Sequence, residues 1–385
     1  MSTASAALAE THPGVTEDSV HFGQTAAFEG PAAALGQGMR LGLKAAFEEA
    51  NRAGGVKGRT LKLTDLDDGY EPEQAAANTR ALIDEHKVFA LIGTVGTPTA
   101  KVIQPLATSA GVPLVGPFTG AGFLRAKGVS NVINVRASYG AEADTWIEHL
   151  TRTGHERIAI LFQDDGFGQA GRTGVLAAMK KRGLSLVAEG KYRRNTVAVK
   201  TALLQIRRAK PDAVVMVGAY RPCAEFITLA RQLGLDATFM NISFVGSAAL
   251  AKRLGAGGFG VMVSQVVPFP NDTSLSLVKQ YHAALKAVDA QAEPGFVSLE
   301  GYMVGRLAIM ALESIDGPVT RATFLDAIYS RKTFDLGGVT LTYSPGDNQG
   351  MDAVYLTRIG AGGRFEAVTQ GGEGQGTRGG QRAEP

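Results

Sequence analysis

The sequence predicts an α/β protein made of two doubly wound α/β lobes joined by three crossover segments. Three observations lead to this prediction. The chain has 385 residues, 45% of them hydrophobic, which is too long for one small core and suits two lobes of ordinary size. From about residue 20, short apolar runs alternate with helix-like stretches, as in a parallel sheet covered by helices. The alternation starts again near residue 155, which predicts the second lobe.

The first lobe begins with strands and helices in turn. Strands are predicted at 19–26, 60–68, 88–93 and 112–117, and helices at 32–52 and 72–87. The first helix has an apolar stripe recurring every four residues, at Leu35, Met39, Leu43 and Phe47, and a Gly-Gly pair ends it. The second begins at Pro72, where a missing N–H group costs no hydrogen bond. The last two strands are short and β-branched, as buried parallel strands are.

The second lobe follows the same rhythm. Strands are predicted at 157–162, 184–190, 213–219 and 237–243, and helices at 169–182, 196–209 and 222–234. Segments 131–138, 264–270 and 337–345 are candidate crossovers, and helices at 273–290 and 296–314 return to the first lobe. The predicted organisation is a disordered N-terminus (1–17), lobe 1 (18–135 plus 268–338), lobe 2 (136–267 plus 339–368) and a disordered, glycine-rich polar tail (369–385).

Composition and charge exclude several classes of function. The net charge is +3 with both signs mixed, and no basic block interleaved with aromatic residues indicates a nucleic-acid partner. The apolar runs have the length of strands, too short to span a bilayer. Cys223 is the only cysteine, so the chain can form no internal disulfide and no cysteine-rich metal site; it is either a packed thiol or a catalytic one. We expect no metal and no cofactor.

The start of the chain admits two interpretations. Residues 1–10 have no basic region and no apolar core of the length that an intact secretory signal needs. The small residues at 7–9, followed by Glu10, resemble the end of a cleaved signal, so the chain fits a trimmed export product. A plain disordered N-terminus fits equally well.

One glycine-rich segment raises the question of a nucleotide site. Residues 164–171, DDGFGQAG, contain the spacing G-x-G-x-x-G, and Glu189 lies near the distance at which a dinucleotide site places its ribose-binding acid. Such a site needs its glycines directly after the strand, whereas here two aspartates come first and would repel a diphosphate. We therefore interpret the segment as a loop in which Phe167 forms an apolar wall, with a solvent loop as the alternative.

Ligands of open α/β sheets bind beyond the carboxyl ends of the strands, and two loops there have the chemistry for a carboxylate. In the loop 93–100, GTVGTPTA, Thr97 and Thr99 add hydroxyls to the free N–H groups of a helix N-terminus, although ordinary helix capping explains them too. In the loop 116–122, GPFTGAG, glycines allow close backbone approach and Thr119 offers a hydroxyl. The two loops together predict one pocket.

The remaining candidates favour binding over catalysis. Tyr220 follows a predicted strand, where it can present its ring and hydroxyl to a cleft, or lie half-buried without that role. No nucleophile elbow and no histidine paired by spacing with serine or cysteine occurs in the sequence. We therefore expect a protein that is not an enzyme.

These motifs together resemble a known family. The chain resembles the type I periplasmic binding proteins, in particular the leucine/isoleucine/valine-binding group that feeds ABC importers. The segments that carry the resemblance are helix 32–52 with its N-x-x-G-G-V-x-G ending, DDGYEPEQAAANTRALI, ALIGTVGTPTAKVIQPLA, GVPLVGPFTG, RIAILFQDDGFGQAG and PDAVVMVGAY. The resemblance covers about residues 20–360. It implies a monomer in the periplasm that closes on a small ligand and docks on ABC permease subunits.

The resemblance also implies roles for single residues. Thr97 and Thr99 would hold the ligand carboxylate, assisted by Phe118, Thr119 and Gly120 of the next loop. Phe167 would wall the site, and Tyr220 would help to hold an ammonium group.

Two positions depart from the pattern. Ser243 stands where relatives place an acid against the ligand ammonium, with Asp164, Asp165 or Glu225 as candidate substitutes, and Leu35 stands where many relatives have an aromatic residue. The ligand is therefore an amino acid, or a carboxylic acid or amide without an α-amine. A ligand sensor of the same fold, acting in regulation, is the alternative function.

Overall fold

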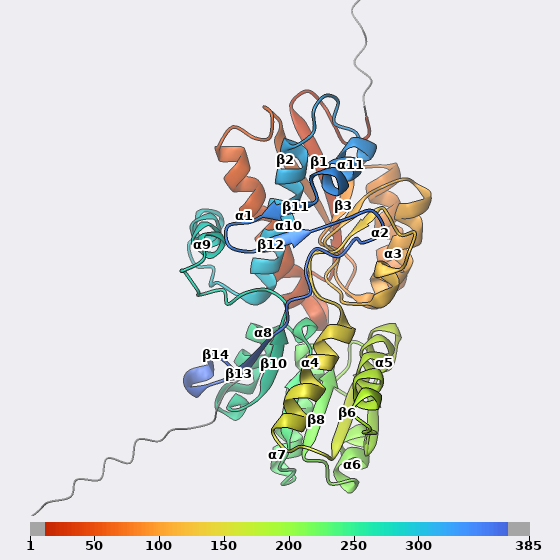
Figure 1. Cartoon of the computed structure of the whole chain (residues 1–385), viewed down its shortest axis with the longest axis vertical. Helices are drawn as coiled ribbons and strands as arrows, with labels where there is room; N and C mark the ends of the chain where they lie inside the picture. Colours follow the sequence, from red (N-terminus) through yellow and green to blue (C-terminus); the bar gives the residue numbers. More distant parts are fainter. Residues whose placement is uncertain (1–11, 369–385) are drawn as a thin grey trace, which may run out of the picture.

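The structure is a computed structural model, and it describes residues 12–368. Two lobes lie one above the other in Figure 1. The upper one, lobe 1, contains both the red-to-orange first third of the chain and blue segments from its last part, so the chain leaves this lobe and returns to it. The lower one, lobe 2, is built mainly from the yellow and green middle of the chain. This arrangement confirms the predicted fold class.

Lobe 1 has a five-stranded parallel sheet in the order β2-β1-β3-β4-β5. Its strands are β1 (Ser19–Ala26), β2 (Thr60–Asp67), β3 (Ala90–Ile92), β4 (Leu114–Val115) and β5 (Val132–Ile133). Its helices are α1 (Ala33–Arg52), α2 (Pro72–Asp84), α3 (Thr97–Ser109), α9 (Ser276–Val288), α10 (Phe296–Glu313) and α11 (Arg321–Arg331), and a hairpin of β11 (Thr333–Asp335) and β12 (Thr340–Thr342) lies beside them. Helix α1 packs on α10 and α9, and α2 packs on α3.

Lobe 2 has a seven-stranded sheet in the order β14-β13-β10-β9-β8-β6-β7, in which β13 pairs antiparallel with both of its neighbours and all other pairs are parallel. Its strands are β6 (Ile158–Gln163), β7 (Ala188–Tyr192), β8 (Ala213–Val217), β9 (Thr238–Asn241), β10 (Met262–Gln265), β13 (Tyr355–Ile359) and β14 (Phe365–Ala367). Its helices are α4 (Tyr139–Arg152), α5 (Gly166–Lys181), α6 (Lys200–Arg208), α7 (Tyr220–Gln232) and α8 (Ser247–Leu254). Five short 3₁₀ turns complete the described chain, at Gly30–Ala32, Gly122–Arg125, Ser243–Val245, Gly255–Gly258 and Ala361–Gly363.

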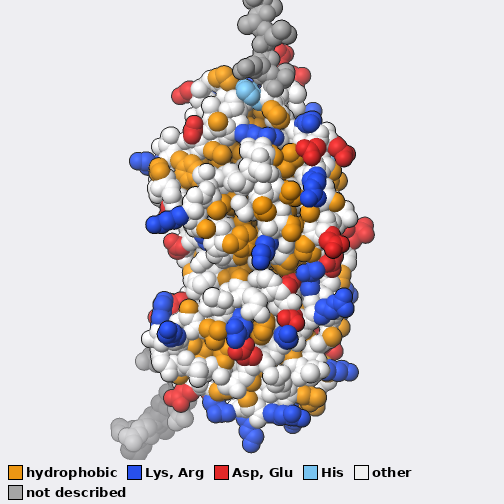
Figure 2. All heavy atoms as spheres, turned by 90° about the vertical axis from the view of Figure 1, so that its right-hand side faces the viewer, with side chains coloured by type: hydrophobic (Ala, Val, Ile, Leu, Met, Phe, Trp, Pro, Cys, Tyr) orange, Lys and Arg blue, Asp and Glu red, His pale blue; other side chains and the backbone are white. Residues whose placement is uncertain are grey.

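The cores lie on both faces of the two sheets. Strands β3, β4, β6 and β8 are buried along their whole length, which explains why they read as continuous apolar runs. None of the helices within residues 12–368 is both long and apolar enough to cross a membrane. Figure 2 shows both signs of charge interspersed over one face, with Lys and Arg gathering toward the far end of lobe 2.

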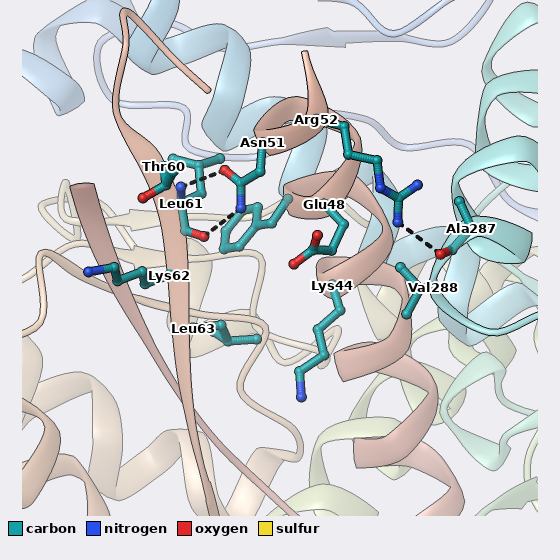
Figure 3. A pocket seen from close by; sticks show the side chains of 11 residues that line it. Lys44, Glu48, Asn51, Arg52, Thr60, Leu61, Lys62, Leu63, Ala287 and Val288 are labelled. Atoms are coloured by element: carbon teal, nitrogen blue, oxygen red, sulfur yellow. Dashed lines mark hydrogen bonds between the residues drawn. The ribbon is translucent and has the colours of Figure 1, made fainter. Parts of the chain in front are cut away.

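The motif at the end of α1 fixes this helix to the edge strand of its sheet. The Asn51 side chain pairs with both backbone groups of Leu61 on β2: Nδ2 donates to the carbonyl at 3.0 Å, and Oδ1 accepts from the N–H at 2.7 Å (Figure 3). Gly55 has a φ of +77°, and a Cβ there would lie 2.2 Å from Arg59 O. The N-x-x-G-G motif therefore has a structural cause, a tight return from helix to strand that only glycine permits.

Several predicted elements have different bounds in the structure. The strand predicted at 184–190 is β7, Ala188–Tyr192, and the β11–β12 hairpin occupies part of the crossover predicted at 337–345. Residues 12–17, included in the predicted disordered N-terminus, form a turn instead, in which Gly14 O accepts from His21 N at 2.8 Å. Residues 1–11 and the tail predicted at 369–385 lie outside the described residues.

Candidate functional site

The candidate site lies between the lobes, where the carboxyl ends of the two parallel sheets face each other. In lobe 1 the strand order reverses between β1 and β3, and in lobe 2 between β6 and β8. Such switch points leave a crevice in which α/β proteins bind ligands. The predicted site loops follow these strands, so the fold brings them to one cleft.

The two threonine loops of lobe 1 meet each other. Thr97 Oγ1 and Thr119 Oγ1 are 2.6 Å apart, and both side chains are buried. The Thr99 hydroxyl donates to Val95 O at 2.5 Å and to Gly96 O, within its own turn of helix. Gly120 O accepts from the N–H of Tyr139, the first residue of α4. The hydroxyls predicted to hold a carboxylate are thus hydrogen-bonded to protein groups in this conformation.

Aromatic side chains from both lobes meet in the cleft. The Phe244 ring lies 5.3 Å from Phe118 and 5.9 Å from Tyr70, both in lobe 1, and 4.6 Å from Phe167 in lobe 2, measured between ring centroids. All four side chains are buried. We call Thr97, Thr119, Phe118, Phe167 and Phe244 the cleft floor.

Ser243, at the position where an acid was expected, lies beside an acid from another element. Glu142 on α4 accepts from the Ser243 hydroxyl and from the Ser243 N–H, both at 2.9 Å, and also from the Ser264 hydroxyl. Arg136, in the segment that joins β5 to α4, donates to the Ser243 hydroxyl. A carboxylate is therefore present beside position 243, but it belongs to Glu142. Its oxygens already accept hydrogen bonds from Ser243 and Ser264.

Arg136 is the centre of a buried group of charges. Its NH2 atom lies 4.0 Å from Glu142 Oε1, and its Nε lies 3.5 Å from Glu300 Oε1 on α10. Its guanidinium also stacks over the Phe118 ring, with Cζ 4.6 Å from the centroid. Burial raises the pKa of Glu300 to about 7, because the loss of hydration outweighs the attraction of Arg136. Burial likewise raises the pKa of Glu142, although Arg136 and three hydrogen bonds oppose the rise.

Sequence reasoning missed Arg136, Glu142 and Phe244. Arg136 is a lone cation in the apolar crossover NVINVRAS, which could have signalled a buried charge in need of partners. Phe244 directly follows the position at which the acid was expected. No spacing links Glu142 to Ser243, 101 residues later, so only the fold reveals that contact.

The glycine-rich segment begins a helix instead of forming a loop. Asp165 caps α5 by accepting from the N–H of Phe167 at 2.9 Å and that of Gly168, and it pairs with Arg194 at 3.1 Å. A Cβ at Gly168 would lie 1.8 Å from Gln163 O. The glycines therefore let the helix approach its strand. Glu189, which lies near the spacing of the ribose-binding acid of a dinucleotide site, forms an ion pair with Arg172 at 2.8 Å instead.

The open space of the cleft lies beside the floor, nearer to its mouth. This cleft cavity has a volume of about 420 Å³ and is lined by the last residue of β6 and by residues that follow β1, β2, β7, β8 and β9. The lining residues are Pro31, Ala32, Tyr70, Gln163, Asn195, Thr196, Val197, Ala219, Arg221, Pro222 and Arg253. Tyr220 is the first residue of α7, and its hydroxyl is 3.5 Å from Ala34 N across the cleft.

Polar contacts hold the two lobes together at the mouth of the cleft. Arg194 NH2 donates to Glu71 Oε2 at 2.6 Å, and Asn195 Nδ2 donates to Glu71 Oε1 at 2.8 Å and to Gly69 O at 3.0 Å. Deeper in the cleft, Gln163 Nε2 lies 3.4 Å from Tyr70 Oη. These contacts join loops of different lobes, so separation of the lobes would break them.

Two further features lie away from the cleft chemistry. A surface hollow of about 670 Å³ in lobe 1 is lined by α1, β2 and the end of α9 (Figure 3). Its polar groups serve the fold: Arg52 donates to Ala287 O at 2.8 Å, and Lys44 pairs with Asp65 at 3.0 Å. Cys223 is fully buried, and burial raises the pKa of its thiol, which favours the packed thiol over a reactive one.

The fold and the position of the cleft define a two-lobed protein that binds a ligand between its lobes. Residues 19–364 match the periplasmic binding protein family, and the chain belongs to that family. The family resemblance inferred from the sequence motifs is thereby confirmed.

Individual relatives agree with this assignment. A crystal structure from Rhodopirellula baltica SH 1, described as that of a possible leucine/isoleucine/valine-binding protein, is 40% identical with a TM-score of 0.88, and the match covers 91% of this chain and 96% of that one. A substrate-binding periplasmic protein from Ralstonia solanacearum is 27% identical with a TM-score of 0.85, covering 90% and 99%. The Leu/Ile/Val-binding protein homolog 3 of Brucella melitensis biotype 1 is 26% identical over 329 residues, covering 84% and 87%.

Proposed function

We propose that this chain is the solute-binding subunit of an ABC importer, which takes a small amino acid or a related carboxylate into the inter-lobe cleft and closes over it in the periplasm. The observation that carries the proposal is a ligand-sized cavity at the switch points of both sheets, bounded by contacts between the lobes. The family and the names of its relatives support it. The closed form would dock on permease subunits as a monomer.

The sequence predicts that each lobe consists of two stretches of chain, 18–135 with 268–338 and 136–267 with 339–368. Because the β11–β12 hairpin spans Thr333–Thr342, we place the third crossover after Thr342. The three connecting segments then act as the hinge about which the lobes close.

Closure can be tested through Glu71. Removing its charge in Glu71→Gln weakens the contacts with Arg194 and Asn195, which exist only when the lobes meet. A ligand that selects the closed form should then bind about two- to fivefold more weakly, since half-exposed ion pairs contribute up to roughly 1 kcal/mol. The matched control is Glu73→Gln, in the first turn of the helix that Glu71 precedes; Glu73 is exposed and has no side-chain hydrogen bond or ion pair among the described residues.

The first measurement is a thermal-shift screen of refolded, ligand-stripped protein with amino acids, the matching acids that lack the amine, and short amides. A ligand at about 100 times its dissociation constant adds roughly 2.7 kcal/mol to the free energy of unfolding, enough to raise the melting temperature by a few degrees. A shift that Glu71→Gln reduces and Glu73→Gln preserves supports binding with closure. No shift with any compound would overturn the proposal.

A sensor of the same fold remains the alternative function, and transport distinguishes it. Reconstituted permease with this chain should accumulate the bound solute if the chain serves an importer. A ligand that binds and closes the cleft without stimulating any permease would favour the sensor.

A further inference from the structure

The charges that line the cleft cavity all have one sign. Arg221 and Arg253 line it, and none of the described residues that line it carries a carboxylate. Neither arginine has a hydrogen bond or an ion-pair partner among residues 12–368. Two guanidinium groups, of the half-buried Arg221 and the exposed Arg253, therefore border a mainly apolar space between the lobes, and no protein acceptor among the described residues takes their N–H groups.

The acidic residues around this cavity are committed elsewhere. Glu71 bonds Arg194 and Asn195, Asp164 pairs with Lys191 at 2.9 Å, and Asp165 caps α5 and pairs with Arg194. Glu142 accepts from Ser243 and Ser264 beneath the cleft floor. Glu225 follows Arg221 by one helical turn, but it neither pairs with it nor lines the cavity. An ammonium group placed in the cavity would therefore meet no carboxylate among the described residues that line it.

The backbone adds to the positive potential at the same place. Helix α7 is 13 residues long and begins at Tyr220, with Ala219 as its N-cap and no side chain capping its first turn. Ala219, Arg221 and Pro222 of this turn all line the cavity. The positive end of the helix dipole thus reinforces the arginines, which favours an anion.

Most of the remaining lining is apolar and fits the body of a small organic molecule; the polar exceptions, Gln163, Asn195 and Thr196, are hydrogen-bonded to Asp165, Glu71 and Arg193 O. Pro31 and Ala32 come from lobe 1, and Val197, Ala219 and Pro222 come from lobe 2. The ring of Tyr70, buried to 1% exposure, closes one side. A volume of about 420 Å³ is in the range of small-molecule sites.

From this lining we infer that the ligand is an organic carboxylate with an apolar body and without an α-ammonium group, whose carboxylate is received by Arg221 and Arg253. The inference rests on the proposed function and narrows its ligand class. A zwitterionic amino acid would lose the hydration of its ammonium beside two cations, with no anion in return. The same acid without the amine keeps the carboxylate contact and avoids that cost.

The test is titration calorimetry with matched pairs that differ only in the α-amine. The pairs are alanine and propanoate, leucine and 4-methylpentanoate, phenylalanine and 3-phenylpropanoate, and tryptophan and indole-3-propanoate. At least one acid should bind, at least about tenfold more tightly than its amino acid, since an unpaired buried charge costs well over 1.4 kcal/mol. Binding of an amino acid more tightly than its partner acid would overturn this inference and leave the proposed function standing. No binding of any of the four acids at roughly 10 mM would also overturn it.

Variants locate the carboxylate. For the acid that binds, Arg221→Gln and Arg253→Gln together should weaken binding by about tenfold or more, because charge-assisted hydrogen bonds are lost. The matched control is Arg208→Gln at the exposed end of α6, which should leave the affinity unchanged. An acid that binds the double variant as tightly as the wild type would refute the assignment of these arginines. Circular dichroism of each variant shows that it is folded.

Discussion

The cleft floor and the cleft cavity lie side by side between the same two lobes, but they differ in whether their polar side chains are bonded to other protein groups. In the floor, the Thr97 and Thr119 hydroxyls are 2.6 Å apart, and the rings of Phe118, Phe167 and Phe244 from both lobes pack on one another. In the cavity, Arg221 and Arg253 have no partner among the described residues. Residue type and loop position alone therefore do not identify a ligand contact. A polar side chain is a candidate contact only when its hydrogen-bonding groups are not already bonded to other protein groups.

The largest expected effect comes from disturbing the support of the floor. Gly168→Ala would place a methyl group 1.8 Å from Gln163 O, which is impossible without moving the first turn of α5 and with it Phe167. We expect a loss of at least about 4 kcal/mol in the free energy of unfolding, the range of severe core disruption. Urea denaturation followed by circular dichroism measures it.

Gly166→Ala is the matched control, two residues earlier in the same G-x-G-x-x-G motif. A Cβ there meets nothing within 4 Å, and alanine favours a helix over glycine by roughly 0.5–1 kcal/mol. It should therefore leave stability unchanged or raise it slightly. Equal losses in the two variants would contradict the close approach of helix to strand as the reason for the motif.

Much of the fold could be predicted from the sequence because local patterns set it. The apolar stripe of α1 predicted its bounds within one residue, 32–52 against Ala33–Arg52. The N-x-x-G-G motif at its end is local as well, since Asn51 and Gly55 act on backbone a few residues away. Strand β7 was misplaced because its apolar residues begin before its sheet pairing, which starts at Ala188.

The site was less predictable because its contacts join distant parts of the chain. The sequence placed Thr97 and Thr119 in one pocket, and the structure brings their hydroxyls together. It gave no sign that Phe244 would pack on Phe118 or that Glu142 would reach Ser243. Tyr220 follows β8 and starts α7, with its hydroxyl 3.5 Å from Ala34 N of the other lobe, and the sequence gave no sign that the neighbouring Arg221 would line the cavity.

A smaller loss of stability should follow from removing one aromatic ring of the cleft floor. Phe244→Ala removes a fully buried ring that touches three other rings, so we expect the free energy of unfolding to fall by about 3–4 kcal/mol. Phe259→Ala, whose side chain is 66% exposed, should change it by less than about 0.5 kcal/mol. Similar values for the two variants would mean that the floor is not packed as the structure has it, and the contrast with the open cavity would then disappear.

The smallest effect concerns the charges beneath the floor, and it depends on pH. Glu300 has a pKa of about 7 in the folded protein, against an ordinary value of 4.5, because burial outweighs its attraction to Arg136. For an acid with a raised pKa, the contribution to stability is complete below about pH 4.5 and is lost as the pH rises through 7. Glu300→Gln removes this titration. Between pH 4.5 and 8, the variant should therefore gain stability relative to the wild type, by at most about 3 kcal/mol.

Urea denaturation of both proteins across this pH range measures the difference in stability. Burial also raises the pKa of Asp68 to about 7, but its contribution is the same in both proteins and drops out of the difference. Glu313→Gln, at the exposed end of the same helix, is the control and should track the wild type at every pH. If Glu300→Gln tracks it too, Arg136 holds Glu300 ionised across this pH range. The contrast with the cavity would then be sharper, because the charged groups near the floor pair with one another, whereas Arg221 and Arg253 have no ion-pair partner among the described residues.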